Sequence, residues 1–211
     1  VSMTGETVWE WHAQDEMEIE NYPIHPLGSR DEFCHANSLF PLSNGDYLIS
    51  FRRNSWIFII NRKTKKVRWE KNDYGWGGQH DAQMLDNGNI MLFANGQFGD
   101  SPTHCSRVIE FNPETGEEAW RYEGDPPWTF YSHHISGAQR LWSGNTLICE
   151  GQWGRIFEVT PNGDIVWEYI SPHFGPCGPA SDDKPKAIGN WVFRAYRYAP
   201  DSPEINGRLP G

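Results

Sequence analysis

Short apolar runs alternate with polar turns along most of the chain. In three copies an apolar run leads into a turn of Asn and Gly, and a second apolar run follows: HANSLFPLSNGDYLISF (35–51), QHDAQMLDNGNIMLFA (79–94) and HISGAQRLWSGNTLICE (134–150). Asn and Gly tolerate positive φ, so turns of this kind join antiparallel strands. Each copy therefore predicts a β-hairpin.

A second type of hairpin follows each of these copies. Its apolar run alternates, a polar turn comes next, and the last strand carries a Trp: WIFIINRKTKKVRWE (56–70), RVIEFNPETGEEAWRYE (107–123) and RIFEVTPNGDIVWEYIS (155–171). The segment TGETVWEW (4–11) has the same form without a preceding hairpin. Four antiparallel strands repeated every ~40–50 residues are typical of β-propeller blades. The pattern predicts an all-β protein with three whole four-stranded blades and part of a fourth.

A ring of blades usually has about four to eight members. Further N-terminal blades, or a second copy in a homo-oligomer, would therefore be needed to complete the ring. The last part of the chain departs from the repeat. Residues 171–186 have the composition of a loop, and residues 190–200 (NWVFRAYRYAP) predict either one more strand or a packed C-terminal arm. We expect residues 1–211 to form a single partial propeller, with 171–211 as an irregular C-terminal segment.

Composition supports this fold and excludes some functions. The 211 residues include 11 Trp, 21 Gly and 15 Pro, which suits a protein rich in strands and turns. A formal net charge of −10 with scattered acidic residues argues against the basic face that nucleic-acid binding needs. No apolar run is long enough to span a membrane. The four cysteines lack CxxC spacing, and the sequence does not decide whether any of them pair.

Polar residues recur at equivalent places in the three copies. Relative to the turn glycines, the starts of the innermost strands carry His35 with Asn37, His80, and His134 with Ser136. Residues two apart in a strand face the same side, so these groups are expected to converge at the mouth of a central channel. Further polar candidates lie nearby in the copies: Arg52, Asn95, Arg107 and His133.

Imidazole, guanidinium and amide groups that converge are suited to an anionic ligand, because Arg forms charge-assisted hydrogen bonds to phosphate- or sulfate-like groups. Histidine can also act as a base or a nucleophile. Two alternatives remain open. Each histidine can have a structural hydrogen-bonding role, and His35, His80 and His134 together can bind a metal ion such as Zn²⁺.

With these motifs the chain resembles the arylsulfotransferase (ASST-type) β-propeller family. The similarity lies in residues 35–52, 79–96, 106–120 and 130–169, and VFRAYRYAPD in the tail also resembles family members. The resemblance implies a six-bladed propeller in a periplasmic or secreted protein. It also implies transfer of a sulfuryl group from an aryl sulfate to a phenol without the nucleotide donor PAPS, through a sulfated histidine and without a cofactor or metal.

The resemblance also suggests roles for the candidate residues. His35, His80 and Arg107 match best as sulfate-binding groups, His134 is the candidate nucleophile with His133 in reserve, and Arg52 is a further sulfate ligand. Asn37 and Asn95 complete the expected substrate-binding set. The partners would be small aryl sulfates and phenols. The competing function is a non-catalytic propeller that binds a ligand or a protein, since one propeller scaffold hosts many functions.

Overall fold

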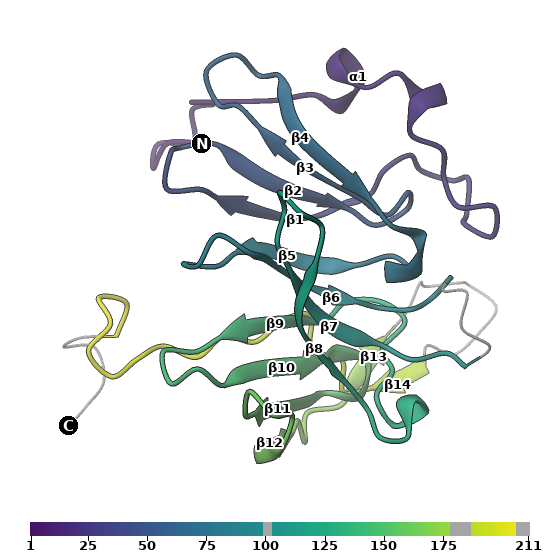
Figure 1. Cartoon of the computed structure of the whole chain (residues 1–211), viewed down its shortest axis with the longest axis vertical. Coiled ribbons are helices and arrows are strands. Elements are labelled where there is room, and N and C mark those ends of the chain that lie inside the picture. Colours follow the sequence, from purple (N-terminus) through teal and green to yellow (C-terminus); the bar gives the residue numbers. More distant parts are fainter. Residues whose placement is uncertain (99–102, 178–186, 206–211) are drawn as a thin grey trace.

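A computed structural model describes residues 1–98, 103–177 and 187–205 of the chain. Three four-stranded antiparallel sheets follow one another along the molecule (Figure 1), each with its strands in sequence order. Blade 1 contains β1 (Ala36–Pro41), β2 (Tyr47–Phe51), β3 (Trp56–Ile60) and β4 (Val67–Asn72). Blade 2 contains β5 (His80–Met84), β6 (Ile90–Ala94), β7 (Arg107–Phe111) and β8 (Glu118–Glu123). Blade 3 contains β9 (Gly137–Arg140), β10 (Thr146–Glu150), β11 (Arg155–Val159) and β12 (Ile165–Ile170).

The helical segments are short. They are α1 (Ala13–Glu16) and the 3-10 turns η1 (Ile19–Asn21), η2 (Tyr74–Trp76), η3 (Pro127–Thr129) and η4 (Gly151–Trp153). A small two-stranded sheet pairs β13 (Gly175–Cys177) with β14 (Ala187–Gly189). The described residues thus form the all-β propeller blades that the repeat predicts.

The turn glycines give the first hairpin of each blade the same geometry. Gly45, Gly88 and Gly144 have φ values of +87°, +84° and +87°, a region that glycine enters without steric cost. In each turn the Gly amide donates to the carbonyl of the Leu three residues earlier, at 2.9 Å. The predicted hairpins are therefore formed as expected.

The main hydrophobic contacts lie between blades. Leu48 and Ile57 of blade 1 pack with Ile90 and Leu92 of blade 2. On the opposite side of blade 2, a second buried cluster joins it to blade 3, with members such as Met91, Phe93, Ile148 and Phe157. Continuous apolar strands are required because β6 and its neighbours are covered on both faces. Each blade therefore depends on its neighbours for burial.

The recurring tryptophans fasten one blade to the next. Each indole N–H donates to a backbone carbonyl in the second hairpin turn of the following blade; the pairs are Trp9 with Arg62 (2.9 Å), Trp69 with Pro113 (3.1 Å) and Trp120 with Pro161 (2.8 Å). Trp167 holds the same place in blade 3, where the described residues offer its indole N–H no acceptor. It is 42% exposed. The repeated Trp thus acts as an inter-blade hydrogen-bond donor as well as an apolar group.

The N-terminal segment lies where the last strand of a further blade would lie. The indole N–H of Trp9 repeats the inter-blade hydrogen bond of Trp69 and Trp120, and Trp9 and Trp11 pack on blade 1 together with Met17 and Tyr22. Residues 4–11 are not in strand conformation, because a strand needs a hydrogen-bonded neighbour and none of the described residues pairs with this segment. The part of a fourth blade that the repeat predicts is therefore present as an unpaired segment.

The C-terminal segment also differs in part from the prediction. Residues 171–186 were expected to be a loop, yet Gly175–Cys177 pairs with Ala187–Gly189; residues 178–186 lie outside the described part of the chain. Residues 190–200 form no strand and run beside β9 as a packed arm (Figure 1). The arm, rather than the extra strand, is the alternative that the structure supports.

The Trp hydrogen bonds can be tested by replacing Trp120 with Phe. The ring keeps most of its packing but cannot donate to Pro161, so we expect a loss of about 0.5–1.5 kcal/mol in the free energy of unfolding. The matched control is Trp167→Phe, whose indole has no such acceptor among the described residues. Chemical denaturation of both variants is the measurement. Equal losses would show that the indole hydrogen bond contributes nothing.

Candidate functional site

His80 is buried where β5 begins. It is 2% exposed, and its Nδ1 lies 2.8 Å from the side-chain oxygen of Asn95 and 3.1 Å from the carbonyl oxygen of Gly78. Both neighbours are acceptors, so Nδ1 carries the proton and Nε2 keeps its lone pair. A bulge between His80 and Gln83 interrupts the pairing with β6, and bulges of this kind redirect side chains near functional sites.

Asn95 fixes this tautomer because its own amide orientation is fixed. The Asn95 side-chain nitrogen donates to the carbonyl oxygens of Ser132 and Ile135, at 2.7 and 2.9 Å. The amide oxygen must then face His80. Asn95 is fully buried after β6, so it joins the imidazole of blade 2 to the loop that leads into blade 3.

His134 lies in that loop, which a network of serines holds in place. Ser132 Oγ donates to the carbonyl of His134 at 2.9 Å, and Ser136 Oγ donates to Ser132 Oγ at 2.9 Å. Ser136 Oγ also accepts from the amide of Gly151 in blade 3. The His134 ring is half-buried, and its Nδ1 is buried without a hydrogen-bond partner. Its centroid is 4.3 Å from that of His133, whose Nδ1 lies 2.7 Å from Gln152 Oε1.

Both imidazoles are held neutral. Burial lowers the pKa of His80 to about 3, and the positive charge of Arg52 and the His134 ring act in the same direction. Burial lowers the pKa of His134 to about 4, with further lowering from His133 and Arg52. Burial also lowers the pKa of Arg52. These mutual effects place two neutral imidazoles and one cation in a single cluster, which joins blades 1, 2 and 3.

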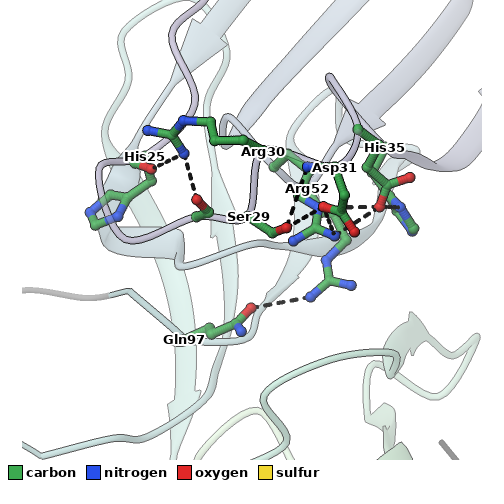
Figure 2. Close-up of polar contacts among 10 residues, drawn as sticks. His25, Ser29, Arg30, Asp31, His35, Arg52 and Gln97 are labelled. Carbon is green, nitrogen blue, oxygen red and sulfur yellow. Dashed lines mark hydrogen bonds and ion pairs between the residues drawn. The ribbon is translucent and has the colours of Figure 1, made fainter. Parts of the chain in front are cut away.

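Arg52 and His35 are backbone neighbours with different side-chain partners. The Arg52 amide donates to the carbonyl of His35 at 3.1 Å, and the Arg52 guanidinium reaches Gln97 Oε1 at 3.1 Å (Figure 2). The His35 ring instead lies 2.5 Å from Glu32, which also pairs with Arg53 at 2.9 Å. His35 is therefore engaged by the Glu32 carboxylate in the loop before β1, while Arg52 is directed toward blade 2.

Asn37 and Arg107 occupy other places. The Asn37 side chain donates to the carbonyl of Gln79 at 2.6 Å, which links β1 to the start of β5. Arg107 donates to the carbonyl of Gly75 at 2.6 Å and lines a hollow of about 230 Å³ between β4 and β7, with Lys71 and Arg121 among its walls. The structure brings His80, His134, His133, Asn95 and Arg52 together, whereas His35 and Arg107 have separate surroundings.

Several further polar and aromatic groups surround this cluster, and Gln79, Arg194 and Trp191 among them were not predicted. Gln79 is fully buried and its amide donates to Ser50, Phe51 and Trp56, which ties blade 2 to blade 1. Asp81 accepts from the Ala138 amide and pairs with Arg194, and it does not hold the His80 ring. Trp191 lies edge-on to His134, with centroids 4.5 Å apart. The polar and aromatic alternation of the tail was the available signal for Arg194 and Trp191.

The metal alternative finds no geometric support. In the part of the chain that the structure describes, no group of three or more His, Cys, Asp or Glu side chains is placed to hold a metal ion. Cys34, Cys105, Cys149 and Cys177 are all unpaired thiols. Across the described ranges, no helix has the length and apolar character to cross a membrane. The arrangement suits an anion held beside a neutral, nucleophilic nitrogen.

Solved structures support the fold and no more. The chain is similar to hydrazine synthase of Kuenenia stuttgartiensis (12% identity, TM-score 0.50, 72% of this chain and 41% of that chain). It is also similar to a protein of unknown function from Bacteroides caccae (18%, 0.49, 66% and 47%) and to a streptogramin B lyase (12%, 0.49, 72% and 45%). The chain spans less than half the length of each.

A search of curated protein sequences found no match. The family comparison is decisive by contrast, because the model for arylsulfotransferase (ASST) matches residues 2–172, which is most of the chain and includes all three blades. The chain therefore belongs to the arylsulfotransferase family.

Proposed function

We propose that this chain carries the sulfuryl-transfer site of an aryl sulfotransferase that does not use a nucleotide donor. The supporting observation is the cluster of two neutral imidazoles, His80 and His134, beside the partly buried guanidinium of Arg52. A neutral imidazole can attack sulfur, and a desolvated guanidinium binds the sulfate oxygens strongly. Family membership supports the same reaction class.

His134 is proposed as the group that becomes sulfated. It is more accessible than His80, and the serine network fixes the loop that carries it. A ring nitrogen of His134 attacks the sulfur of the aryl sulfate, the N–S bond forms, and the S–O bond breaks to release a phenolate. In the second step the oxygen of a phenol attacks the same sulfur, the N–S bond breaks, and the phenol proton leaves to a base or to solvent.

The low pKa values restrict the supporting chemistry. Neither His80 nor His134 holds a proton to give to the departing phenolate near neutral pH, because their pKa values are about 3 and 4. Phenols that are stable as phenolates should therefore be the better leaving groups. His80 Nε2 retains a lone pair and can accept a hydrogen bond from the incoming phenol. Arg52 would stabilise negative charge on the sulfuryl oxygens in the transition state.

The rest of the channel wall belongs to the same proposal. All residues of β12 are exposed, and Leu39 of β1 is 56% exposed, so both ends of the three-blade array can accept a further blade. Additional blades of the polypeptide, or a second copy, would complete the ring. A periplasmic or secreted location accompanies this proposal as an expectation for the family.

His134→Ala provides the first test. Without the nucleophile, acceptor-dependent release of 4-nitrophenolate from 4-nitrophenyl sulfate should fall to the background rate. The assay is run with and without a phenol acceptor. His173→Ala, at an exposed position after β12, is the matched control and should keep full activity.

Arg52→Gln should raise KM for the donor about 10- to 100-fold, because a charge-assisted hydrogen bond to the sulfate is lost. Arg62→Gln, which changes an exposed arginine, controls for net charge.

Turnover that survives in His134→Ala would reject His134 as the nucleophile. A wild-type protein that binds the donor but never transfers it would favour the non-catalytic binding platform.

The pH dependence follows from the neutral state of His134. Donor cleavage should be constant from about pH 8 to about pH 5 and fall as the pH approaches about 4, where His134 becomes protonated. His133→Ala removes one cause of the low pKa and should move this fall to higher pH. His12→Ala, at an exposed site in the N-terminal segment, should leave the profile unchanged.

A structural control must accompany the acidic measurements. His80 has a folded-state pKa of about 3, below its ordinary value of 6.5, so the unfolded chain binds a proton first. Stability should therefore decrease as the pH falls from 6.5 toward 3. Circular dichroism at each pH separates loss of structure from loss of the nucleophile. A rate that falls at the ordinary histidine pKa while the protein stays folded would contradict the neutral-imidazole site.

A further inference from the structure

The C-terminal arm (residues 190–198) runs beside β9, the first strand of blade 3, and reaches the other blades. The Val192 amide donates to the carbonyl of Gly151 at 2.9 Å, and the Ser136 amide donates to the carbonyl of Phe193 at 3.0 Å. Farther along, the Arg197 amide donates to the Gln139 side chain at 2.7 Å. Two of these bonds, at Ser136 and Gln139, lie just before and within β9, and the arm runs beside this strand in Figure 1.

A glycine in blade 3, Gly151, leaves space for the backbone of the arm. A Cβ on Gly151 would lie 2.3 Å from the carbonyl oxygen of Val192, which is backbone and cannot move aside independently. Gly151 has no left-handed φ that would by itself call for glycine. The absent side chain is therefore explained by the close approach of the arm. The same segment carries Asn190, which is buried and donates to the carbonyl of Ser171 at 3.0 Å.

Arg194 anchors the arm to the other two blades. Its guanidinium pairs with Asp81 of blade 2 at 3.1 Å and donates to the carbonyl of Asn37 in blade 1 at 3.2 Å. Tyr196 donates to the same Asp81 oxygen at 3.3 Å. Because Asp81 is 4% exposed, this ion pair is shielded from solvent, and removing one partner would leave a buried charge.

The anchored arm places two aromatic rings beside the candidate histidines. The rings of Trp191 and His134 meet edge-on, with their centroids 4.5 Å apart. The rings of Phe193 and His80 are nearly perpendicular, with their centroids 6.5 Å apart. Packing leaves both aromatic side chains partly exposed to solvent, Trp191 to 39% and Phe193 to 54%. Exposed aromatic faces next to a polar cluster can bind an aromatic ligand, which prefers offset or edge-to-face geometry.

We propose that the C-terminal arm forms the aryl-binding wall of the site, with Trp191 as the main contact for the aromatic ring of the substrate and Phe193 as the second. This inference rests on the proposed function, because it assigns the aryl part of the ligand to the arm and the sulfate part to Arg52 and the histidines. Trp191 is a specificity-determining residue in this scheme, and Arg194 positions it through Asp81.

The direct test measures binding without turnover. Isothermal titration with 4-nitrophenyl sulfate and with inorganic sulfate is carried out on His134→Ala, which prevents transfer, and on the same protein with Trp191→Ala, Trp191→Phe or Trp142→Ala. Removal of Trp191 should raise the Kd for 4-nitrophenyl sulfate at least tenfold. The Kd for inorganic sulfate should change less than twofold. Trp191→Phe keeps a ring and should retain most of the affinity. Trp142 is 61% exposed in the turn after β9 and serves as the matched control.

A second measurement uses the unmodified site and needs no destabilising change. The protein is labelled with 5-fluorotryptophan, and the ¹⁹F resonances of Trp191 and Trp142 are assigned from spectra of the Trp191→Phe and Trp142→Phe proteins. The Trp191 resonance should shift on addition of 4-nitrophenyl sulfate and stay in place with inorganic sulfate. The Trp142 resonance should respond to neither probe.

The outcomes separate this inference from the proposed function. Trp191-dependent aryl binding without any sulfuryl transfer supports the arm as an aryl site and rejects the transferase. Transfer that persists with unchanged 4-nitrophenyl sulfate affinity in Trp191→Ala, and an unmoved Trp191 resonance, rejects the arm and leaves the transferase in place. Equal weakening of both probes, or no binding of 4-nitrophenyl sulfate to the wild type, overturns the inference.

Discussion

The arrangement of blade 2, blade 3 and the C-terminal arm around the candidate histidines depends on one buried carboxylate, Asp81. It accepts from the Ala138 amide of blade 3 at 3.1 Å and pairs with Arg194 of the arm at 3.1 Å, while its own strand carries His80. Gly137 has no side chain because a Cβ there would lie 2.3 Å from the Asp81 carboxylate. Burial raises the pKa of Asp81 to about 6, and Arg194 opposes this effect. A buried charge with one strong partner holds that partner firmly, so Asp81 links blade 2, blade 3 and the arm.

The fold could be predicted because each repeat carries short sequence features that determine local structure. Gly at each hairpin turn and Trp at each last strand occur at equivalent places, and each has a local physical reason. Whether residues 4–11 pair as a strand could not be predicted, because a strand depends on neighbours that a single segment does not reveal. The path of the arm depends on close contacts such as Gly151 with Val192, which are distant in sequence.

The candidate site could be predicted in part, and the reason is again backbone geometry. The rule that residues two apart share a face holds for a regular strand, but bulges interrupt β1 after Ala36 and β5 after His80. His35 and Asp81 also have positive φ, at 54° and 55°. Equivalent positions therefore point to different surroundings, and His35 pairs with Glu32 while His80 bonds to Asn95. Periodicity indicated which segments carry the candidate residues, and local backbone distortions decided which of their side chains meet.

The electrostatics of the cluster give the two imidazoles and the guanidinium complementary roles. Burial and the positive charge of Arg52 make a protonated His80 or His134 unfavourable and lower the pKa of both rings. The histidines therefore stay neutral and available as nucleophiles or acceptors. A bound sulfate would reverse part of this effect, since its negative charge compensates Arg52. In the proposed site the blades would provide the charged and nucleophilic groups, and the arm would provide aromatic surface at Trp191 and Phe193. Because these contributions come from separate segments, aryl preference would change through the arm without altering the nitrogen atoms proposed to carry the sulfuryl group.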